Sequence, residues 1–444
     1  MSLTKVTYSM IAGAPVNVND FGAVGDGVTD DTAAIQAALD TGYDVVFPSP
    51  SYLISDSLSV GSQRLIGGIN EKDINRSQTI INVSGNTPCF VNAEGEPSFV
   101  IDGFFIYYGD TTPVSSTGND QKIAFKFTQN TLWPAYIEIR NCTVRGAWYG
   151  YYDNTGTYLS KLTQVACRNT KNGYYKYGGT TIYFDTCSTS GGVTGFYIQS
   201  VISPNLNNCS ADELTVAANS AGNLFSGITS LTINGWDGEG NTINGPNAAY
   251  MWFQTTTGVV NGFSGVSNTL VATTGQEVYF FYSTDNSAIT INGFQVNRDP
   301  SWLAYSGTGG TCFTLKAYNF GQCVLIGSEF SAPTGGSPSN RYSVGGFSSA
   351  WITLIETYTN NLTAGISANI FQGTVSITPS SGALGFFGKT PTTLQSPSGS
   401  TAITTPGSTN TVYRDTTFTG SVGTTAYTIG DIVAALKNYG LLSN

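Results

Sequence analysis

The stretch DFGAVGDGVTDDTAAIQAALDTG, residues 20–42, joins a glycine-rich turn to a short helical pattern and holds five carboxylates. Its apolar residues recur at the spacing of one helix face: Ala34, Ile35, Ala38 and Leu39. Asp30 or Asp31 can cap the first turn, and Gly42 can end the helix in a left-handed conformation. We therefore expect these carboxylates to shape a helix rather than to form a catalytic or metal site.

The composition favours many short strands and turns. Of 444 residues only 10% are charged, 12% are aromatic and 53 are Gly. The net charge of −10 argues against a nucleic-acid binder. The chain has no His, which excludes Ser-His-Asp triads and His-ligated zinc. Acid–base chemistry must then use Asp, Glu, Tyr, Lys or Arg.

Signals for export, membrane insertion and metal binding are missing from the sequence. The start MSLTKVTYSMIAGAPV lacks the apolar run of a secretory signal, and no run of about 18 apolar residues is present. The seven Cys form no C-x-x-C pair, so neither disulfides nor a zinc site are expected. We expect synthesis in a reducing cytoplasm, with no membrane insertion, no cofactor and no metal.

The middle of the chain repeats. The segments YIEIRNCTVRGAWYGYY, LTQVACRNTKNGYYKY and TIYFDTCSTSGGVTGFY share a short strand, a Cys and a later aromatic pair. Cys142, Cys167, Cys187 and Cys209 are separated by 25, 20 and 22 residues, and later copies carry Trp236, Phe263 and Phe294 instead. This period is typical of a solenoid in which equivalent residues stack. We predict an all-β, right-handed parallel β-helix with a buried Cys column, whose amino-terminal end the helix in TDDTAAIQAALDTG would cover.

The motif DFGAVGDGVTDDTAAIQAAL followed by VVFPSPSYLI resembles the amino-terminal motif of pectate-lyase-like β-helix proteins. With KVTYSMIAGAPVNVN before it, the chain is most similar to bacteriophage tail spikes. The resemblance covers roughly residues 5–60 and is specific for fold rather than for reaction. It implies a homotrimer in the virion tail that binds, and usually degrades, a polysaccharide of the bacterial surface.

Three segments are expected. Residues 1–19 would form a neck, residues 20–375 the β-helix with its helical cap, and residues 376–444 a β-rich trimerisation region ending in a short helix. The last segment is rich in Pro, Ser, Thr and Gly before IVAALKNYGLL. The terminal helix can pack against neighbouring subunits or fold back on its own β-helix.

A carboxylate pair is sought in one column, because glycoside cleavage needs one carboxyl group as proton donor and another as nucleophile or base. Three residues beyond the column anchors stand Arg145, Thr170, Ser190, Asp212 and Glu239. Asp212 and Glu239 are then neighbours on adjacent turns, flanked by Glu213 and Asp237. These four are the candidate catalytic residues, although solvated turn carboxylates would give the same pattern. Other acidic candidates are Asp153, Asp185, Glu277, Asp285, Asp299 and Glu329.

Candidate substrate-binding residues lie in the same copies. Trp148, Trp236 and Trp252 can stack on sugar rings. Residues 140–176 hold six basic side chains against one acid, Asp153, a local charge of +5: Arg140, Arg145, Lys161, Arg168, Lys171 and Lys176. Arg145, Arg168 and Lys171 are chosen as ligands of an acidic polysaccharide. A scattered, solvated surface is the alternative.

The favoured hypothesis is a trimeric phage tailspike that depolymerises a host capsule, O-antigen or exopolysaccharide as an endoglycosidase. It would be made in the host cytoplasm, act from the virion tail and contact other tail or baseplate proteins. A polysaccharide lyase of the same fold and a spike that binds without cleaving remain alternatives. A bacterial pectinase-like enzyme is disfavoured because the His of the polygalacturonase pattern is missing.

Overall fold

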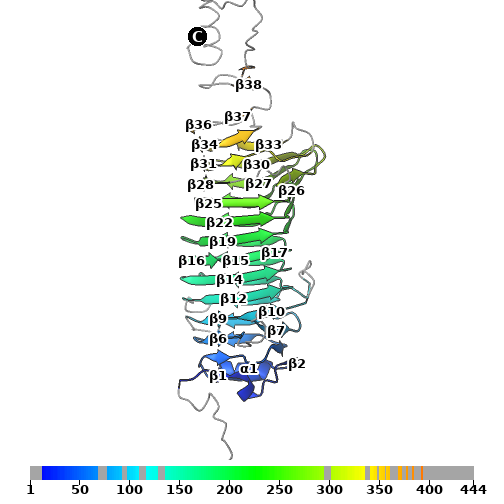
Figure 1. Cartoon of the computed structure of the whole chain (residues 1–444), viewed down its shortest axis with the longest axis vertical. Coiled ribbons are helices and arrows are strands. Elements are labelled where there is room, and N and C mark those ends of the chain that lie inside the picture. The colour runs from blue at the N-terminus through cyan, green and yellow to red at the C-terminus, as the bar shows by residue number, and fades with distance from the viewer. Residues whose placement is uncertain are drawn as a thin grey trace, which may run out of the picture.

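The structure, a computed structural model, describes residues 13–68, 78–92, 98–109, 117–128, 136–294, 302–335, 341–347, 350–355 and 357. It also gives the backbone of five further strands between Tyr358 and Thr393. The chain winds as a tall coil with one short helix at its amino-terminal end (Figure 1). Within the described residues every strand pairing but that of β38 with β39 is parallel, which confirms the predicted parallel β-helix.

One long sheet of 19 described strands runs up the coil. Its strands are β1 (Val16–Asn17), β2 (Asp26–Asp30), β3 (Val45–Val46), β4 (Ser51–Ile54), β6 (Arg64–Ile66), β7 (Thr79–Val83), β9 (Val100–Asp102), β10 (Phe104–Tyr107), β12 (Glu138–Arg145), β14 (Ser160–Arg168), β16 (Ile182–Asp185), β17 (Ser188–Ser190), β19 (Asn205–Asp212), β22 (Leu231–Glu239), β25 (Thr257–Val266), β28 (Ala288–Asn292), β31 (Gln322–Ile326), β34 (Trp351–Ile355) and β36 (Asn369–Gln372).

A second sheet of 11 described strands forms another wall of the coil: β5 (Leu58–Val60), β8 (Phe90–Asn92), β11 (Ile123–Phe127), β13 (Tyr149–Asp153), β15 (Asn172–Tyr177), β18 (Thr194–Gln199), β21 (Ala221–Ser226), β24 (Ala248–Gln254), β27 (Glu277–Thr284), β30 (Thr311–Tyr318) and β33 (Arg341–Phe347). A third sheet enters between them further along: β20 (Thr215–Val216), β23 (Thr242–Asn244), β26 (Asn268–Val271) and β29 (Leu303–Tyr305). The remaining described strands are β32 (Glu329–Phe330), β35 (Tyr358–Asn360), β37 (Ile377–Thr378), β38 (Ala383–Leu384) and β39 (Thr392–Thr393).

The helix α1 (Thr32–Leu39) packs against the 3-10 turn η2 (Val18–Phe21) and β5 through its buried residues Ile35, Ala38 and Leu39. The Asp30 carboxylate accepts the Thr32 N–H at 3.0 Å, and the Asp31 carboxylate accepts the Val24 N–H at 2.7 Å. Gly42 follows the helix with a φ of +72°. The carboxylates of this stretch therefore hold the turn and the helix start.

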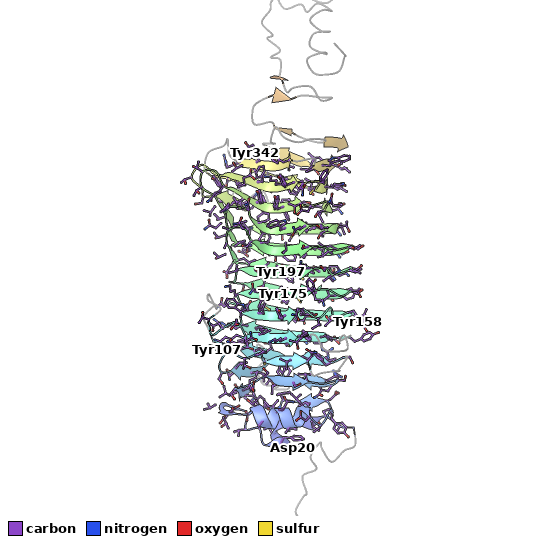
Figure 2. All side chains as sticks on the ribbon, turned by 180° about the vertical axis from the view of Figure 1, so that it is seen from behind. Asp20, Tyr107, Tyr158, Tyr175, Tyr197 and Tyr342 are labelled. Atoms are coloured by element: carbon purple, nitrogen blue, oxygen red, sulfur yellow. The ribbon has the colours of Figure 1, made fainter. Side chains whose placement is uncertain are left out.

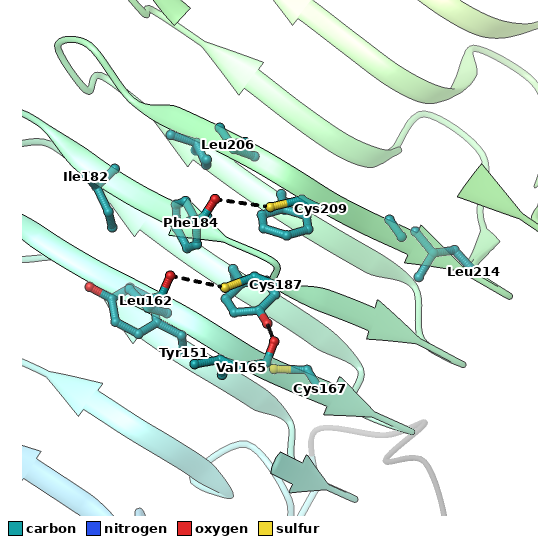
Figure 3. Close-up of a cluster of buried hydrophobic side chains, with 14 of the residues drawn as sticks. Tyr151, Leu162, Val165, Cys167, Ile182, Phe184, Cys187, Leu206, Cys209 and Leu214 are labelled. Atoms are coloured by element: carbon teal, nitrogen blue, oxygen red, sulfur yellow. Dashed lines mark hydrogen bonds between the residues drawn. The ribbon is translucent and has the colours of Figure 1, made fainter. Parts of the chain in front are cut away.

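The Cys column is confirmed in part. Cys142 pairs with Val165, and the register continues through Cys187 and Cys209, whose following residues pair in turn. Figure 3 shows Cys187 and Cys209 on successive strands, each thiol donating to a carbonyl of the strand before it. All three thiols are buried and free.

The place of Cys167 in that column was predicted wrongly. Cys167 pairs with Val144 and Thr189, two positions further along its strand, although it is also buried and free. The turn from Cys142 to Val165 contains 23 residues, not the 25 that the Cys spacing implied. The column then continues as expected, because Cys209 pairs with Trp236 and Trp236 with Phe263.

The inner faces of the long and second sheets fit each other by size. Gly150 faces Cys167 so closely that a Cβ at Gly150 would overlap the sulfur. Further along the coil the arrangement is reversed, because the glycine is on the long sheet and the larger side chain on the second sheet: Gly238 of β22 faces the Tyr250 ring of β24. Close packing of this kind fixes which residue type each column accepts.

A buried ion pair joins two turns of the second sheet. Asp153 and Lys176 pair in register, both side chains are fully buried, and the Lys176 Nζ lies 2.6 Å from the Asp153 Oδ2. The Lys176 ammonium also donates to the Thr157 hydroxyl and carbonyl oxygen. Asp153 is thus a structural residue, and it neutralises one of the basic residues counted between 140 and 176.

Parts of the expected domain layout lie outside the described residues. These are residues 1–12 of the neck and, apart from β37, β38 and β39, residues 376–444 with the terminal helix. In the part of the chain that the structure describes, no helix has the length and apolar character needed to cross a bilayer.

Replacement of Cys187 by Arg should abolish soluble folded protein, because an unpaired guanidinium would enter the dry core at a cost of several kcal/mol. Ser188→Arg is the matched control, since Ser188 is the next residue and faces outward. Soluble yield and a cooperative thermal transition measure the effect. Normal folding of the Cys187→Arg variant would contradict the stacked core.

Replacement of Lys176 by Met should lower the free energy of unfolding by about 3–5 kcal/mol, because Asp153 would stay buried without its partner. Lys161→Met is the control: Lys161 lies 3.5 Å from Asp185 in an exposed pair, and such pairs contribute less than about 1 kcal/mol. Denaturant unfolding compares the two variants. Equal losses of unfolding free energy in the two variants would contradict a larger contribution of the buried pair to stability.

Candidate functional site

One outward-facing column of the long sheet carries two basic residues, then a serine and then two acidic residues along the coil. Arg145 pairs with Arg168, Arg168 with Ser190, and Ser190 with Asp212. Asp212 is followed on the next turn by Glu239, because Ser210 and Asp237, two residues earlier, are paired. Successive members lie about 4.8 Å apart along the coil.

This column is the one sought in the sequence, with one correction. The count placed Thr170 on the second turn, but Arg168 occupies that place and Thr170 is fully buried. The cause is again the 23-residue turn, which shifts the register by two. Asp212 and Glu239 do lie on adjacent turns.

Side chains of β19, β22 and β25 form a cluster, here called the acidic cluster: Ser210, Asp212, Asp237, Glu239 and Ser264. The Asp212 Oδ1 accepts the Glu239 N–H at 3.0 Å, and the Asp237 Oδ1 accepts the Ser264 hydroxyl at 2.8 Å. Asp212 is partly buried, whereas Asp237 and Glu239 are exposed. The serines were not identified from the sequence, although the same column count taken two residues earlier would have reached them.

Burial raises the pKa of Asp212 above its ordinary value. The Glu239 N–H and the Ser210 hydroxyl oppose this rise, while the neighbouring charges of Asp237 and Glu239 add to it. A desolvated carboxyl group among like charges retains its proton to higher pH, which is the property of a general acid.

Glu213 has a different position from the other three predicted acids. Its φ is +53°, and its N–H donates to the Glu239 carbonyl oxygen at 2.7 Å. It therefore occupies the bend where the long sheet ends, and its exposed side chain leaves the coil beside the acidic cluster.

Basic residues gather at the same bend on earlier turns. Trp148 and Lys171 directly precede the paired residues Tyr149 and Asn172, so they too are neighbours on adjacent turns. The Lys171 Nζ lies 3.9 Å from the centre of the Trp148 ring. One face of that ring is consequently covered by the ammonium group.

The local charge of +5 predicted for residues 140–176 is smaller on the surface. Arg140 is paired with Asp102 at 2.8 Å, Lys161 with Asp185, and Lys176 with Asp153. Arg145, Arg168 and Lys171 lie at the bend of the coil on the turns before the acidic cluster.

Two of the predicted sugar-stacking residues lie elsewhere. Trp236 is buried in the core, where its Nε1 donates to the Tyr250 hydroxyl at 3.0 Å, so its predicted role in sugar binding is wrong. Trp236 pairs with Cys209 and therefore occupies the same inward-facing column. Trp252 lies on the outer face of the second sheet, with its Nε1 donating to Thr284.

Three of the other acidic candidates accept hydrogen bonds from neighbouring side chains of the fold. The Asp185 carboxylate accepts from Asn207, Asp285 from Gln254 and Asn319, and Glu277 from Tyr279 and Lys316. Glu329 begins β32. Asp299 lies outside the described residues.

Stacked tyrosines cover the outer face of the second sheet. The rings of Tyr152 and Tyr175 are 4.9 Å apart at 15°, and those of Tyr175 and Tyr197 are 5.0 Å apart at 16°. Figure 2 shows Tyr175 and Tyr197 one above the other. The rings cover each other's faces, which leaves mainly edges and hydroxyls for solvent.

The family of the chain follows from a match over residues 15–245 to a family described as "Rhamnogalacturonase A/epimerase, pectate lyase-like". The match spans just over half of the chain and includes β12 to β22, on which the column lies. The chain belongs to this pectate lyase-like family.

Curated relatives match parts of this pectate lyase-like chain. The pre-neck appendage protein of Bacillus phage phi29 is 25% identical over 143 residues, which are 30% of this chain and 16% of that protein. Mannuronan C5-epimerase AlgE5 of Azotobacter vinelandii is 57% identical over 44 residues, 9% of this chain and 4% of that protein. Each match thus spans less than a fifth of the relative's length.

Among solved structures, the gp42 tailspike of Acinetobacter phage vb_AbaP_AS12 is similar with a TM-score of 0.47 and 11% identity. The similarity covers 83% of this chain and 63% of the tailspike chain. Among the described residues of the pectate lyase-like chain, no group of three or more Cys, Asp or Glu is arranged to hold a metal ion.

Replacement of Asp212 by Asn should raise the melting temperature at pH 7. The folded chain holds the Asp212 proton more tightly than the unfolded chain, so ionised Asp212 opposes folding above its folded pKa. The gain should shrink as the pH falls through the raised pKa of Asp212 toward the ordinary value of 3.8, and it should be absent below 3.8, where the carboxyl group is protonated in both states.

Asp30→Asn is the control of opposite sign. The Ser55 hydroxyl, followed by the Thr32 hydroxyl and N–H, lowers the pKa of Asp30, so this variant should lose stability at pH 7. Thermal melts of the parent and both variants between pH 3 and pH 7 provide the comparison. A lower melting temperature for Asp212→Asn at pH 7 would contradict the assignment.

Proposed function

We propose that this chain is a tailspike-type depolymerase that cleaves a bacterial surface polysaccharide by hydrolysis at the acidic cluster. One observation carries the proposal: Asp212 and Glu239 stand on adjacent turns, and burial raises the pKa of Asp212. Membership of a family with polysaccharide-active members in its description supports a carbohydrate substrate.

Asp212 is assigned as the general acid. Its desolvated carboxyl group retains a proton that it can donate to the oxygen of the leaving sugar. The neighbouring carboxyl groups of Asp237 and Glu239 add to the raised pKa of Asp212, and negative charge at this site would stabilise positive charge that develops at the sugar carbon.

Glu239 is assigned as the partner carboxylate, acting as nucleophile or as base toward water. It is exposed, and the residues that flank the pair in the column carry no carboxylate: Val266 follows Glu239 and Ser190 precedes Asp212. The Asp212–Glu239 pair is therefore the carboxylate pair within that column, at a separation of one turn. Such a spacing lies within the range that glycosidases use.

The setting of this activity is proposed to be a phage tail. The pre-neck appendage proteins of Bacillus phages and the Acinetobacter phage tailspike support this setting by their names. We propose a homotrimer that attaches to other tail proteins and meets capsule, O-antigen or exopolysaccharide at the host surface.

Asp212→Asn and Glu239→Gln should each reduce depolymerisation about 10²–10⁴-fold, because each removes a proton-transfer or nucleophilic group. The parent's activity should fall as the pH rises through the raised pKa of Asp212, since the acid must be protonated. Size-exclusion chromatography of capsule, O-antigen and exopolysaccharide preparations after incubation measures the chain length.

Asp285→Asn is the control, because Asp285 is held at a distant turn by Asn319 and Gln254. Full activity of both site variants would overturn the site assignment. Products that absorb in the near ultraviolet would reassign the reaction to β-elimination. Binding without shortening of any chain would leave a spike that only recognises its host.

A further inference from the structure

We infer that the outer face of the second sheet is the surface through which one copy of this chain packs against a second copy. The inference rests on the proposed function only for the assembly of several copies, and it names the surface that joins them. This surface, here called the tyrosine face, consists of the outward residues Tyr149, Tyr152, Tyr175, Tyr197, Leu224, Trp252 and Tyr282.

The first argument is the continuity of an apolar column on this face. Six apolar residues pair in register on successive turns: Tyr152, Tyr175, Tyr197, Leu224, Trp252 and Tyr282. All but Tyr282 are only half-buried by the chain itself. A contiguous apolar surface that extends over several turns and faces solvent is typical of an interaction site.

The second argument is the lack of charge. Within β13, β15, β18, β21 and β24 the charged residues are Asp153 and Lys176 alone, and these two are buried as an ion pair. Burial, followed by the nearby Tyr152 and Tyr197 hydroxyls, raises the pKa of Tyr175 to about 12, so its hydroxyl is neutral at pH 7. Depletion of charge together with enrichment of Tyr and Trp is typical of the buried centre of a protein interface.

The third argument favours a protein over a sugar as the occupant. The Tyr175 ring lies between the rings of Tyr152 and Tyr197, at centroid distances of 4.9 and 5.0 Å (Figure 2). Both faces of the Tyr175 ring are thus covered, so a sugar ring cannot stack on it, and the column presents ring edges to solvent. A wall of ring edges is suited to close packing against another protein wall.

The fourth argument is the size of the face. The column runs over seven turns from Lys126 to Lys316, which is about 34 Å at about 4.8 Å per turn. A strand of six residues, such as β15, makes the face about 20 Å wide and its area about 680 Å². A standard interface buries about 800 Å² on each partner. A second copy has straight walls of the same length and the same repeat, so it can cover the tyrosine face from end to end.

The experiment uses the fact that all seven Cys of the full chain are free and buried. Leu224→Cys places a reactive thiol in the middle of the tyrosine face, and its modification by a bulky maleimide polymer reports whether the face is covered. Tyr175→Glu, and as a second choice Tyr152→Glu, is added to disrupt the contact. Tyr43→Glu is the matched control, because Tyr43 is an exposed Tyr at the amino-terminal end of the coil. Light scattering gives the number of copies, and thermal melts verify that each variant is folded.

We expect the parent to be an assembly in which the thiol introduced at position 224 is protected. Tyr175→Glu should weaken the contact at least about 100-fold, because it buries an unpaired carboxylate, and the thiol should then react. With Tyr43→Glu the thiol should stay protected. The inference is overturned if the parent is a monomer, if the thiol reacts equally fast with and without Tyr175→Glu, or if Tyr43→Glu removes the protection to the same extent.

The two proposals fail separately, because the acidic cluster lies on the long sheet and the tyrosine face on the second sheet. Cleavage of polysaccharide by a monomeric parent would overturn the interface and leave the catalytic assignment in place. A protected tyrosine face in a chain that cleaves no polysaccharide would support the interface and remove the depolymerase. Protection of the thiol at position 224 by added polysaccharide in a monomeric parent would overturn the interface and assign the face to sugar binding.

Discussion

The constraint on which this molecule depends is the parallel register, which places each side chain about 4.8 Å from its equivalent on the next turn. Inside the coil, the small residues Cys142, Val165, Cys187 and Cys209 follow one another on turns of about 22 residues. The step from Cys209 to Trp236 takes 27 residues, because β20 and the third sheet begin there. The added wall widens the coil, and the wider section accepts Trp236, Tyr250 and Phe263.

The same register determines which charged side chains have a partner of opposite charge on the adjacent turn. Asp153 and Lys176 neutralise each other across one turn inside the coil. On the outer face, Asn207, Asn234, Asn261 and Asn292 each donate to the residue one turn before, so amide hydrogen bonds connect this ladder back to the Asp185 carboxylate, which is paired with Lys161. Like charges on adjacent turns depart from this pattern at the acidic cluster, where Asp212 lies beside Asp237 and Glu239. Departures from local consistency of this kind are expected at functional sites.

The sequence predicted the coil well, because the repeat of strand, Cys and aromatic pair reports directly on stacking. It also placed Asp212 beside Glu239, since the turns between Cys187 and Trp236 carry an anchor each. It failed where an anchor changes position: Cys167 lies two residues past its column, and Thr170 was therefore exchanged for Arg168. Trp236 was predicted as a sugar ligand although it fills the anchor position, and an anchor position faces the core. The spacing of the repeats gives the number of residues per turn, but the residue at which the chain bends sets the register of the paired strands.

Without His, a carboxyl group whose pKa is raised is one of the groups that a chain can use to donate protons. A carboxylate at a turn of this coil shows the opposite shift. Hydrogen bonds from the Thr29 N–H first, and from the Val28 N–H next, lower the pKa of Asp26 and favour its ionised form. Asp212 receives donors as well, from Glu239 and Ser210, yet its burial outweighs them and raises its pKa. A merely solvated turn residue would not show this balance. The proposed role of Asp212 as a proton donor rests on this balance together with its position on a strand face beside two further carboxylates.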